Sequence, residues 1–290
     1  MKEKSQLRES PTNRLLGYPA DARLLIINAD DFGMCHATNE AIFHTLKQGM
    51  VRSTTLMVPC PWAAHAMNLL RANSEIRFGI HLTVVGDTAN YRWRPLSCRE
   101  KVPSLVDETG HFFTSDRIPE FLAQARLDEV EVEFSAQIEA VLAADLKPTH
   151  LDWHSLRIAR RPDIFGVMLR LAKEYGLALR VRERSLIEKV QRMGLPTNDY
   201  DFLDSYLLDT DGKSARYVQL LRDLPVGLSE WAVHPGLASA ELRAIEPDGA
   251  SVRQADFDFW MSPEARETIQ QEGIVLLNYA PLQEVWRAGR

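Results

Sequence analysis

Short apolar segments alternate with segments of helical periodicity along most of the chain. The apolar segments have the length and the β-branched content of buried strands. We predict strands at residues 23–28, 53–58, 77–84, 149–154, 177–182, 230–235 and 274–279. Because strands that alternate with helices form βαβ units, the pattern predicts a parallel sheet.

The segments between these strands carry apolar residues at the spacing of one helix face. We predict helices at residues 38–49, 62–73, 118–144 and 161–176. Two of them end in a glycine, Gly49 and Gly176, which is a common way for a helix to stop. Parallel strands in this number could form either a doubly wound open sheet or an incompletely closed (β/α) barrel.

Two stretches, residues 86–117 and 185–213, do not follow this alternation. Loops of that length inside a compact domain usually serve as lids or binding loops. The chain shows no linker, repeat or low-complexity segment, so we predict one domain over residues 23–290. Residues 1–22 are charged and lack the apolar core of a signal peptide, and we expect a poorly ordered extension there.

Composition and charge exclude several classes of protein. The chain has 290 residues and a net charge of −6 without a basic block, which argues against a nucleic-acid partner. No apolar run reaches the roughly 18 residues of a membrane span. The three cysteines, Cys35, Cys60 and Cys98, fit neither a disulfide framework nor a CxxC metal site, so we expect reduced thiols in a cytoplasmic protein.

Polar side chains that suit a metal ion follow several of the predicted strands. Asp30 and Asp31 come directly after the first strand, His81 lies near the end of the third, and His154 and His234 end the fourth and sixth. The carboxyl ends of parallel strands share one edge, where sites are built. One carboxylate with two imidazoles forms a ligand set that leaves positions open for water. A divalent cation would also offset the repulsion between the paired aspartates.

Each of these residues also has a purely structural interpretation. An Asp-Asp pair after a strand is often a turn with a helix cap, and a single histidine at a strand end is usually a hydrogen-bonded core residue. Their joint occurrence at four strand ends favours a site. In "KPTHLDWH", His150, Asp152 and His154 share one face of the predicted strand, so His150 or Asp152 could support a ligating imidazole.

Several motifs together resemble one known family. "NADDFG", "RSTTLMV", "FGIHLTV", "KPTHLDWH", "LALRVR" and "VHPG" follow one another, from Leu24 to Tyr279, as in the YdjC/ChbG family of carbohydrate deacetylases. The resemblance implies a deviant, polysaccharide-deacetylase-like (β/α) barrel with about seven parallel strands. It also implies one divalent metal ion, zinc or magnesium, and removal of the N-acetyl group from an amino sugar or oligosaccharide of the N-acetylglucosamine type.

The resemblance assigns roles to individual residues. Asp31, His81 and His154 match the metal ligands, Asp30 the general base and His234 the general acid, although the two aspartates could exchange roles. We add Arg180 in "LALRVR" and Trp93 in the first long loop as candidates for contact with the sugar. A set of two histidines and one aspartate suits zinc, iron, cobalt or nickel, whereas magnesium favours more oxygen ligands.

The chain departs from the family at one motif. Family members commonly read "DSHxHxH" where this chain has "DWHSLRIA", so Leu156 and Ile158 replace two histidines. Two other interpretations therefore stay open: a metal-dependent phosphoesterase, and a catalytically silent relative that binds a sugar or a partner protein. A homodimer also stays open.

Overall fold

The centre of the molecule is a curved parallel sheet. The structure, a computed structural model, describes residues 10–156 and 160–289. Within these residues, eight strands pair in parallel in the order β7-β6-β3-β2-β1-β9-β8, and β10 lies beside the first half of β1. The strands are β1 (Arg23–Phe32), β2 (Ser53–Leu56), β3 (Phe78–Leu82), β6 (His150–Trp153), β7 (Ala178–Leu179), β8 (Leu203–Asp204), β9 (Gly227–Val233) and β10 (Val275–Leu277).

The first strand occupies the middle of this sheet. It pairs with β9 along Arg23–Ala29 on one side, and on the other side first with β10 and then with β2. Leu24, Leu25, Ile26 and Ile27 are fully buried, because a strand with neighbours on both sides and covered faces needs apolar side chains throughout.

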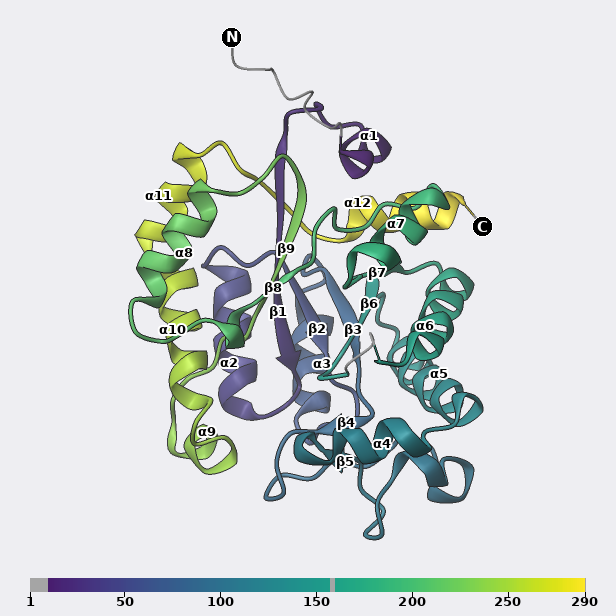
Figure 1. Cartoon of the computed structure of the whole chain (residues 1–290). Helices are drawn as coiled ribbons and strands as arrows, with labels where there is room; N and C mark the ends of the chain where they lie inside the picture. Colours follow the sequence, from purple (N-terminus) through teal and green to yellow (C-terminus); the bar gives the residue numbers. More distant parts are fainter. Residues whose placement is uncertain (1–9, 157–159, 290) are drawn as a thin grey trace.

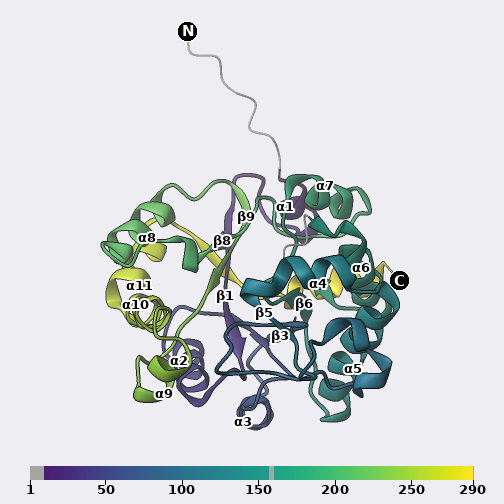
Figure 2. The same cartoon turned by 60° about the horizontal axis from the view of Figure 1, so that its bottom comes forward.

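Helices cover the outer face of the sheet along both flanks (Figure 1). In Figure 2 as in Figure 1, α2, α8, α10 and α11 lie on one flank, and α5 and α6 lie on the other. The main helices are α2 (His36–Lys47), α3 (Ala63–Ala72), α4 (Ile118–Gln124), α5 (Leu127–Ala143), α6 (Pro162–Tyr175), α8 (Lys213–Arg222), α9 (Ala240–Ile245), α10 (Ala250–Met261), α11 (Pro263–Gln271) and α12 (Ala280–Ala288). The end strands β7 and β8 do not pair with each other in the described chain, so the barrel stays open. The predicted (β/α) barrel fold is confirmed.

The two stretches without periodicity contain short elements. Residues 86–117 hold a small two-stranded sheet, in which β4 (Val85–Gly86) pairs with β5 (Phe113–Thr114), and short 3-10 turns. Residues 185–213 are not one long loop, because they include most of α7 (Arg184–Arg192), the strand β8 and the turn η5 (Ser205–Leu207). Both stretches reach the carboxyl ends of the strands.

The single helix predicted over residues 118–144 is two helices, α4 and α5, separated at Ala125 and Arg126. The guanidinium of Arg161 donates hydrogen bonds to the carbonyl oxygens of Leu122 and Ala125. The backbone N–H of Arg126 donates to Ser104 Oγ. These partners from distant segments hold the backbone groups that a continuous helix would pair internally.

The first helix, α1 (Pro11–Leu16), lies within the stretch expected to be a poorly ordered extension. Ser10 caps α1 and also donates a hydrogen bond to Asp199, 2.6 Å away, and Thr12 donates to the carbonyl oxygen of Thr197. Residues 10–22 therefore pack against the barrel. The boundary at residue 22 stays a prediction. In the described part of the chain, no helix has both the length and the apolarity that crossing a bilayer requires.

Candidate metal centre

The backbone of β1 bends at Asp30 and Asp31. The pairing register with β2 shifts between Ala29 and Phe32, and Asp31 has a φ of 71°, in the left-handed region. Successive side chains of a regular strand point to opposite faces, so the bend is what allows Asp30 and Asp31 to face the same cavity. A left-handed residue other than glycine costs on the order of 1–3 kcal/mol.

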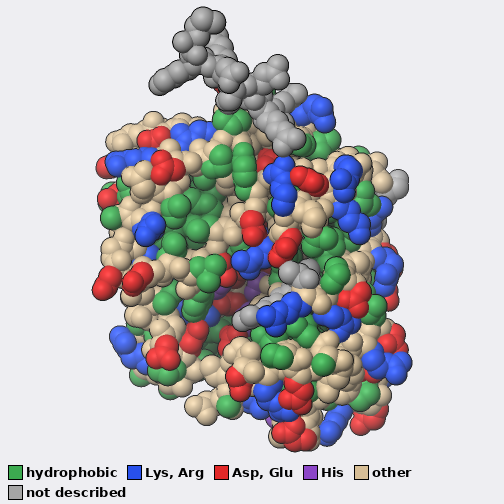
Figure 3. All heavy atoms as spheres, in the orientation of Figure 1, with side chains coloured by type: hydrophobic (Ala, Val, Ile, Leu, Met, Phe, Trp, Pro, Cys, Tyr) green, Lys and Arg blue, Asp and Glu red, His purple; other side chains and the backbone are tan. Residues whose placement is uncertain are grey.

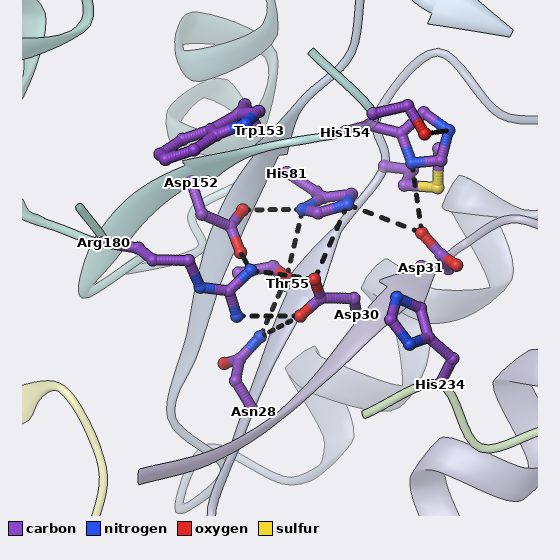
Figure 4. A network of polar contacts seen from close by, with 12 residues as sticks. Asn28, Asp30, Asp31, Thr55, His81, Asp152, Trp153, His154, Arg180 and His234 are labelled. Atoms are coloured by element: carbon purple, nitrogen blue, oxygen red, sulfur yellow. Dashed lines mark hydrogen bonds and ion pairs between the residues drawn. The ribbon is translucent and has the colours of Figure 1, made fainter. Parts of the chain in front are cut away.

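Three predicted ligands meet at this point. Asp31 Oδ1 lies 3.4 Å from His81 Nε2 on β3 and 3.3 Å from His154 Nδ1, just after β6 (Figure 4). Tetrahedral zinc bonds of about 2.0–2.2 Å place ligand atoms about 3.4 Å apart. In the described structure the buried Asp31 Oδ1 accepts no well-formed hydrogen bond. Both observations fit a divalent metal ion between Asp31, His81 and His154, which form a buried group that could hold one.

Two further carboxylates orient the imidazoles. His81 Nδ1 donates to Asp152 Oδ1 at 2.7 Å, and His154 Nε2 donates to Asp87 Oδ1 at 2.7 Å. Because a carboxylate can only accept, these bonds place a proton on the outer nitrogen of each ring and turn the other nitrogen towards Asp31. Of the two candidates for this supporting role, Asp152 fills it. His150 instead stacks on Tyr279, with ring centroids 3.6 Å apart.

The same carboxylates change the acidity of both rings. Burial alone would lower the pKa of His81, but Asp152 and the aspartates of β1 raise it to about 9. Burial opposes protonation of His154 as well, yet Asp87 and Asp31 raise its pKa to about 10. Without metal, both imidazoles are therefore charged near neutral pH, and a metal ion must displace a proton from each.

The guanidinium of Arg180 holds Asp30, the other aspartate of β1. Burial would raise the pKa of Asp30, but Arg180 holds it well below its usual range through two bonds of 2.8 Å. Arg180 also contacts Asp152 Oδ2 at 2.8 Å and Glu230 Oε1 at 2.6 Å, and it is 1% exposed. These contacts occupy most of its N–H groups with protein carboxylates. The predicted contact of Arg180 with a sugar stays a prediction.

His234 follows β9 and faces the same group of residues (Figure 4). Its backbone N–H donates to Asp256, and its Nδ1 shares a hydrogen bond of 2.8 Å with Ser205 Oγ. The ring also packs edge-on against Tyr206. With Nδ1 engaged, Nε2 is the ring nitrogen left for a ligand in the cavity that His234 lines.

A cavity of about 750 Å³ is lined by all the predicted site residues except Trp93, namely Asp30, Asp31, His81, His154, Arg180 and His234. Figure 3 shows its mouth as a hollow in which histidine, acidic and basic side chains gather. Leu156 lines it, whereas Ile158 lies outside the described residues. Trp93 is buried, packs edge-on against His154 and does not line the cavity, so its position gives no support to the predicted contact with a sugar. A second cavity of about 950 Å³, near α1 and α7, contains none of the predicted site residues.

Sequence reasoning missed several residues of the site. Asp87 comes from the first long loop, Ser205 from the second, and Arg253 from α10, where its guanidinium donates to Asp31 Oδ2 at 2.7 Å. For Asp87 and Ser205 the only signal in the sequence was their position in the two long stretches predicted to be lids or binding loops. Arg253 carries no signal in the sequence, because it lies on a helix more than 200 residues after its partner.

Comparisons with known proteins agree with this geometry. The model of a family described as YdjC-like protein matches residues 24–271. A carbohydrate deacetylase from Thermus thermophilus is 34% identical over 279 residues, which is 92% of this chain and 94% of the relative. One from Clostridium beijerinckii is 31% identical and is covered over 98% of its length, against 88% of this chain. A crystal structure from Enterococcus faecalis, named for a suspected cellobiose-phosphate cleavage activity, superimposes with a TM-score of 0.77 at 30% identity, covering 90% of this chain and 99% of its own.

Proposed function

Because this chain belongs to the YdjC-like family, we propose that it is a metal-dependent carbohydrate deacetylase. It removes the N-acetyl group from an amino sugar or oligosaccharide of the N-acetylglucosamine type. The observation that carries the proposal is the buried group of Asp31, His81 and His154, with Asp30 beside it, in a cavity large enough for a sugar. Relatives of about the same length carry the name carbohydrate deacetylase.

Asp31, His81 and His154 would hold the metal ion through one oxygen and two nitrogens. Such a donor set suits zinc better than magnesium, which favours oxygen ligands. When bound, the ion supplies a Lewis acid for the acetyl carbonyl and lowers the pKa of a water molecule. The remaining steps fall to side chains of the cavity.

Asp30 accepts the proton of the attacking water. Arg180 lowers the pKa of this carboxylate, so it stays ionised and in its accepting form near neutral pH. The same guanidinium also lowers its basicity, and for that reason the water must itself be acidified. Asn28 Nδ2 donates to Asp30 Oδ1 at 2.7 Å and helps to fix the direction of the carboxylate.

His234 delivers a proton to the departing amine. Its Nδ1 is held by Ser205, so a proton on Nε2 points into the cavity. Breaking an amide requires this step, because an amine leaves readily only after protonation. Replacing a general acid typically lowers the rate by about 10²–10⁴-fold.

The test is release of acetate from a panel of N-acetylated mono- and oligosaccharides, with and without a chelator. We expect chelator-sensitive acetate release, normal metal content in His234→Gln, and a loss of about 10²–10⁴-fold in kcat/KM for that variant. Phosphate release from sugar phosphates without acetate release would favour the phosphoesterase. Stoichiometric metal with neither product would favour the silent relative.

A further inference from the structure

A second group of potential metal ligands lies outside the cavity, on α2 and α3. His36 and Glu40 occupy successive turns of α2, and His65 lies in the first turn of α3. One ligand atom from each of the three lies within 4.8 Å of the others. None of the three lines the cavity of the candidate metal centre.

His36 and Glu40 are too far apart for a hydrogen bond and close enough to share an ion. His36 Nε2 lies 3.7 Å from Glu40 Oε1, close to the separation of about 3.4 Å expected between two ligands of a tetrahedral zinc ion. The rings of His36 and His65 lie with centroids 5.4 Å apart, and Trp62 packs against both. Helix geometry places His36 and Glu40, four residues apart, on the same face.

The group is open to solvent, so an ion can enter. The side chains of His36 and Glu40 are 49% and 33% exposed. The start of a helix disfavours a cation, but here Glu241 accepts hydrogen bonds from the backbone N–H groups of His36 and Ala37 and offsets that charge. Two imidazoles and one carboxylate suit zinc and neighbouring transition metals, with water completing the coordination.

We propose that His36, Glu40 and His65 form a second transition-metal site, distinct from that of Asp31, that clamps α2 to α3. The proposal does not depend on the deacetylase activity. The two helices follow β1 and β2, and Asn39 of α2 already connects them. Its side chain accepts a hydrogen bond from the backbone N–H of Gly33 and donates to the carbonyl oxygen of Trp62. It also lies 3.1 Å from Nδ1 of His65, and that hydrogen bond leaves Nε2 of the same ring for an ion. A bound ion would add a stronger link at the same end of the helices.

The experiment titrates metal-free full-length protein with Zn²⁺ and counts the bound equivalents. We expect two in the wild type and one in either His36→Ala or His65→Ala. His154→Ala is also expected to bind one, and the double variant His65→Ala/His154→Ala none. Even a residue that only supports a ligand affects affinity by about 10–100-fold, so loss of a ligand should weaken the second equivalent by at least that factor.

The matched control is His44→Ala. His44 lies on the same helix, 4.0 Å from the other oxygen of Glu40, but outside the three-residue group. We expect it to keep both equivalents. A wild type whose single equivalent disappears in His154→Ala, unchanged Zn²⁺ affinity in both His36→Ala and His65→Ala, or the same loss in His44→Ala would overturn the proposal. A rise in Tm with Zn²⁺ that survives His154→Ala but disappears in His65→Ala/His154→Ala would support it independently.

Discussion

At the scale of single residues, Asp31 and Asp30 illustrate how one bend separates two chemically identical side chains. Asp31 has the left-handed backbone and an oxygen without a hydrogen-bond donor, whereas both oxygens of Asp30 are bonded to Arg180. This difference in environment supports the proposal that Asp31 holds the metal and Asp30 accepts the proton. Adjacent carboxylates in a sequence cannot show this difference, because it depends on partners 150 and 222 residues away.

Changing each aspartate to asparagine tests this division. Asn tolerates the left-handed backbone, so Asp31→Asn should fold normally and lose stoichiometric metal. Asp30→Asn should keep the metal and lose about 10²–10⁴-fold in kcat, because an amide cannot accept the proton of water. Metal analysis and steady-state kinetics measure the two effects. If the outcomes are reversed, the two aspartates exchange roles.

Metal binding should depend steeply on pH. With pKa values of about 9 and 10 in the metal-free chain, His81 and His154 both carry an extra proton at pH 7. Binding should therefore release about two protons, and the affinity should fall as the pH decreases. Calorimetry of metal binding in buffers of different ionisation enthalpy counts the released protons. A count near zero at pH 7 would mean that neither imidazole has a raised pKa.

At the scale of elements, sequence periodicity predicted the strands that build the site and the helices α2, α3 and α6, but it gave no prediction for α8 to α12. The apolar runs of β1, β3, β6 and β9 were found because buried parallel strands are almost uniformly hydrophobic. The separation of α4 from α5 was missed, since neither Ala125 nor Arg126 is a helix breaker and the interruption depends on Arg161 and Ser104. The two-residue strand β8 is too short to produce a pattern.

The close approach of β3 to β6 leaves no room for a side chain at Gly79. A Cβ at this position would lie 2.5 Å from the ring of His150, which is itself fixed against Tyr279. Gly79→Ala should therefore reduce the free energy of unfolding by about 1–3 kcal/mol. Urea denaturation measures the loss.

Gly166 provides the matched control for that substitution. It lies inside α6, and a Cβ there would meet no atom of the described structure within 4 Å. Gly166→Ala should increase the free energy of unfolding by about 0.5–1 kcal/mol, because alanine favours the helix. Equal effects at Gly79 and Gly166 would show that the contact with His150 carries no energetic cost.

At the scale of the whole molecule, Arg180 connects four strands through buried charges. From the end of β7 it contacts Asp30 on β1, Asp152 on β6 and Glu230 on β9. Glu230 in turn accepts a hydrogen bond from Tyr279. Removing the guanidinium from such a group leaves poorly compensated carboxylates inside the protein, which is more costly than the net contribution of the intact group.

Arg180→Ala should consequently destabilise the protein by about 3–5 kcal/mol. Arg182→Ala is the control, because Arg182 pairs with Asp201 at 3.5 Å on the surface, with both side chains substantially exposed. Its effect should stay below about 1 kcal/mol. Urea denaturation of the two variants gives the comparison, and similar losses for both would contradict a special role for the buried group.

The proposed ligands and proton carriers could be named from the sequence because they lie at strand ends, where the topology of a parallel barrel brings distant residues together. The residues that hold them were harder to find. Asp87, Ser205 and Arg253 come from loops and a helix, and no spacing relates them to the groups they contact. An aromatic residue in a long loop suggested a sugar contact for Trp93, but the structure buries it beside His154, and the contact stays a prediction without structural support.

The pairing of β1 with β10 has a consequence for synthesis of the chain. Leu24 pairs with Val275, about 250 residues later in the chain, so one edge of the central strand has no neighbour over its first half until residue 275 has left the ribosome. Until then the nascent chain exposes an unpaired apolar edge, the type of surface through which partly made proteins aggregate. The barrel therefore cannot complete its folding before residues 275–277 have emerged, and a ribosome that stalls before residue 275 leaves a product suited to chaperone binding or proteolysis.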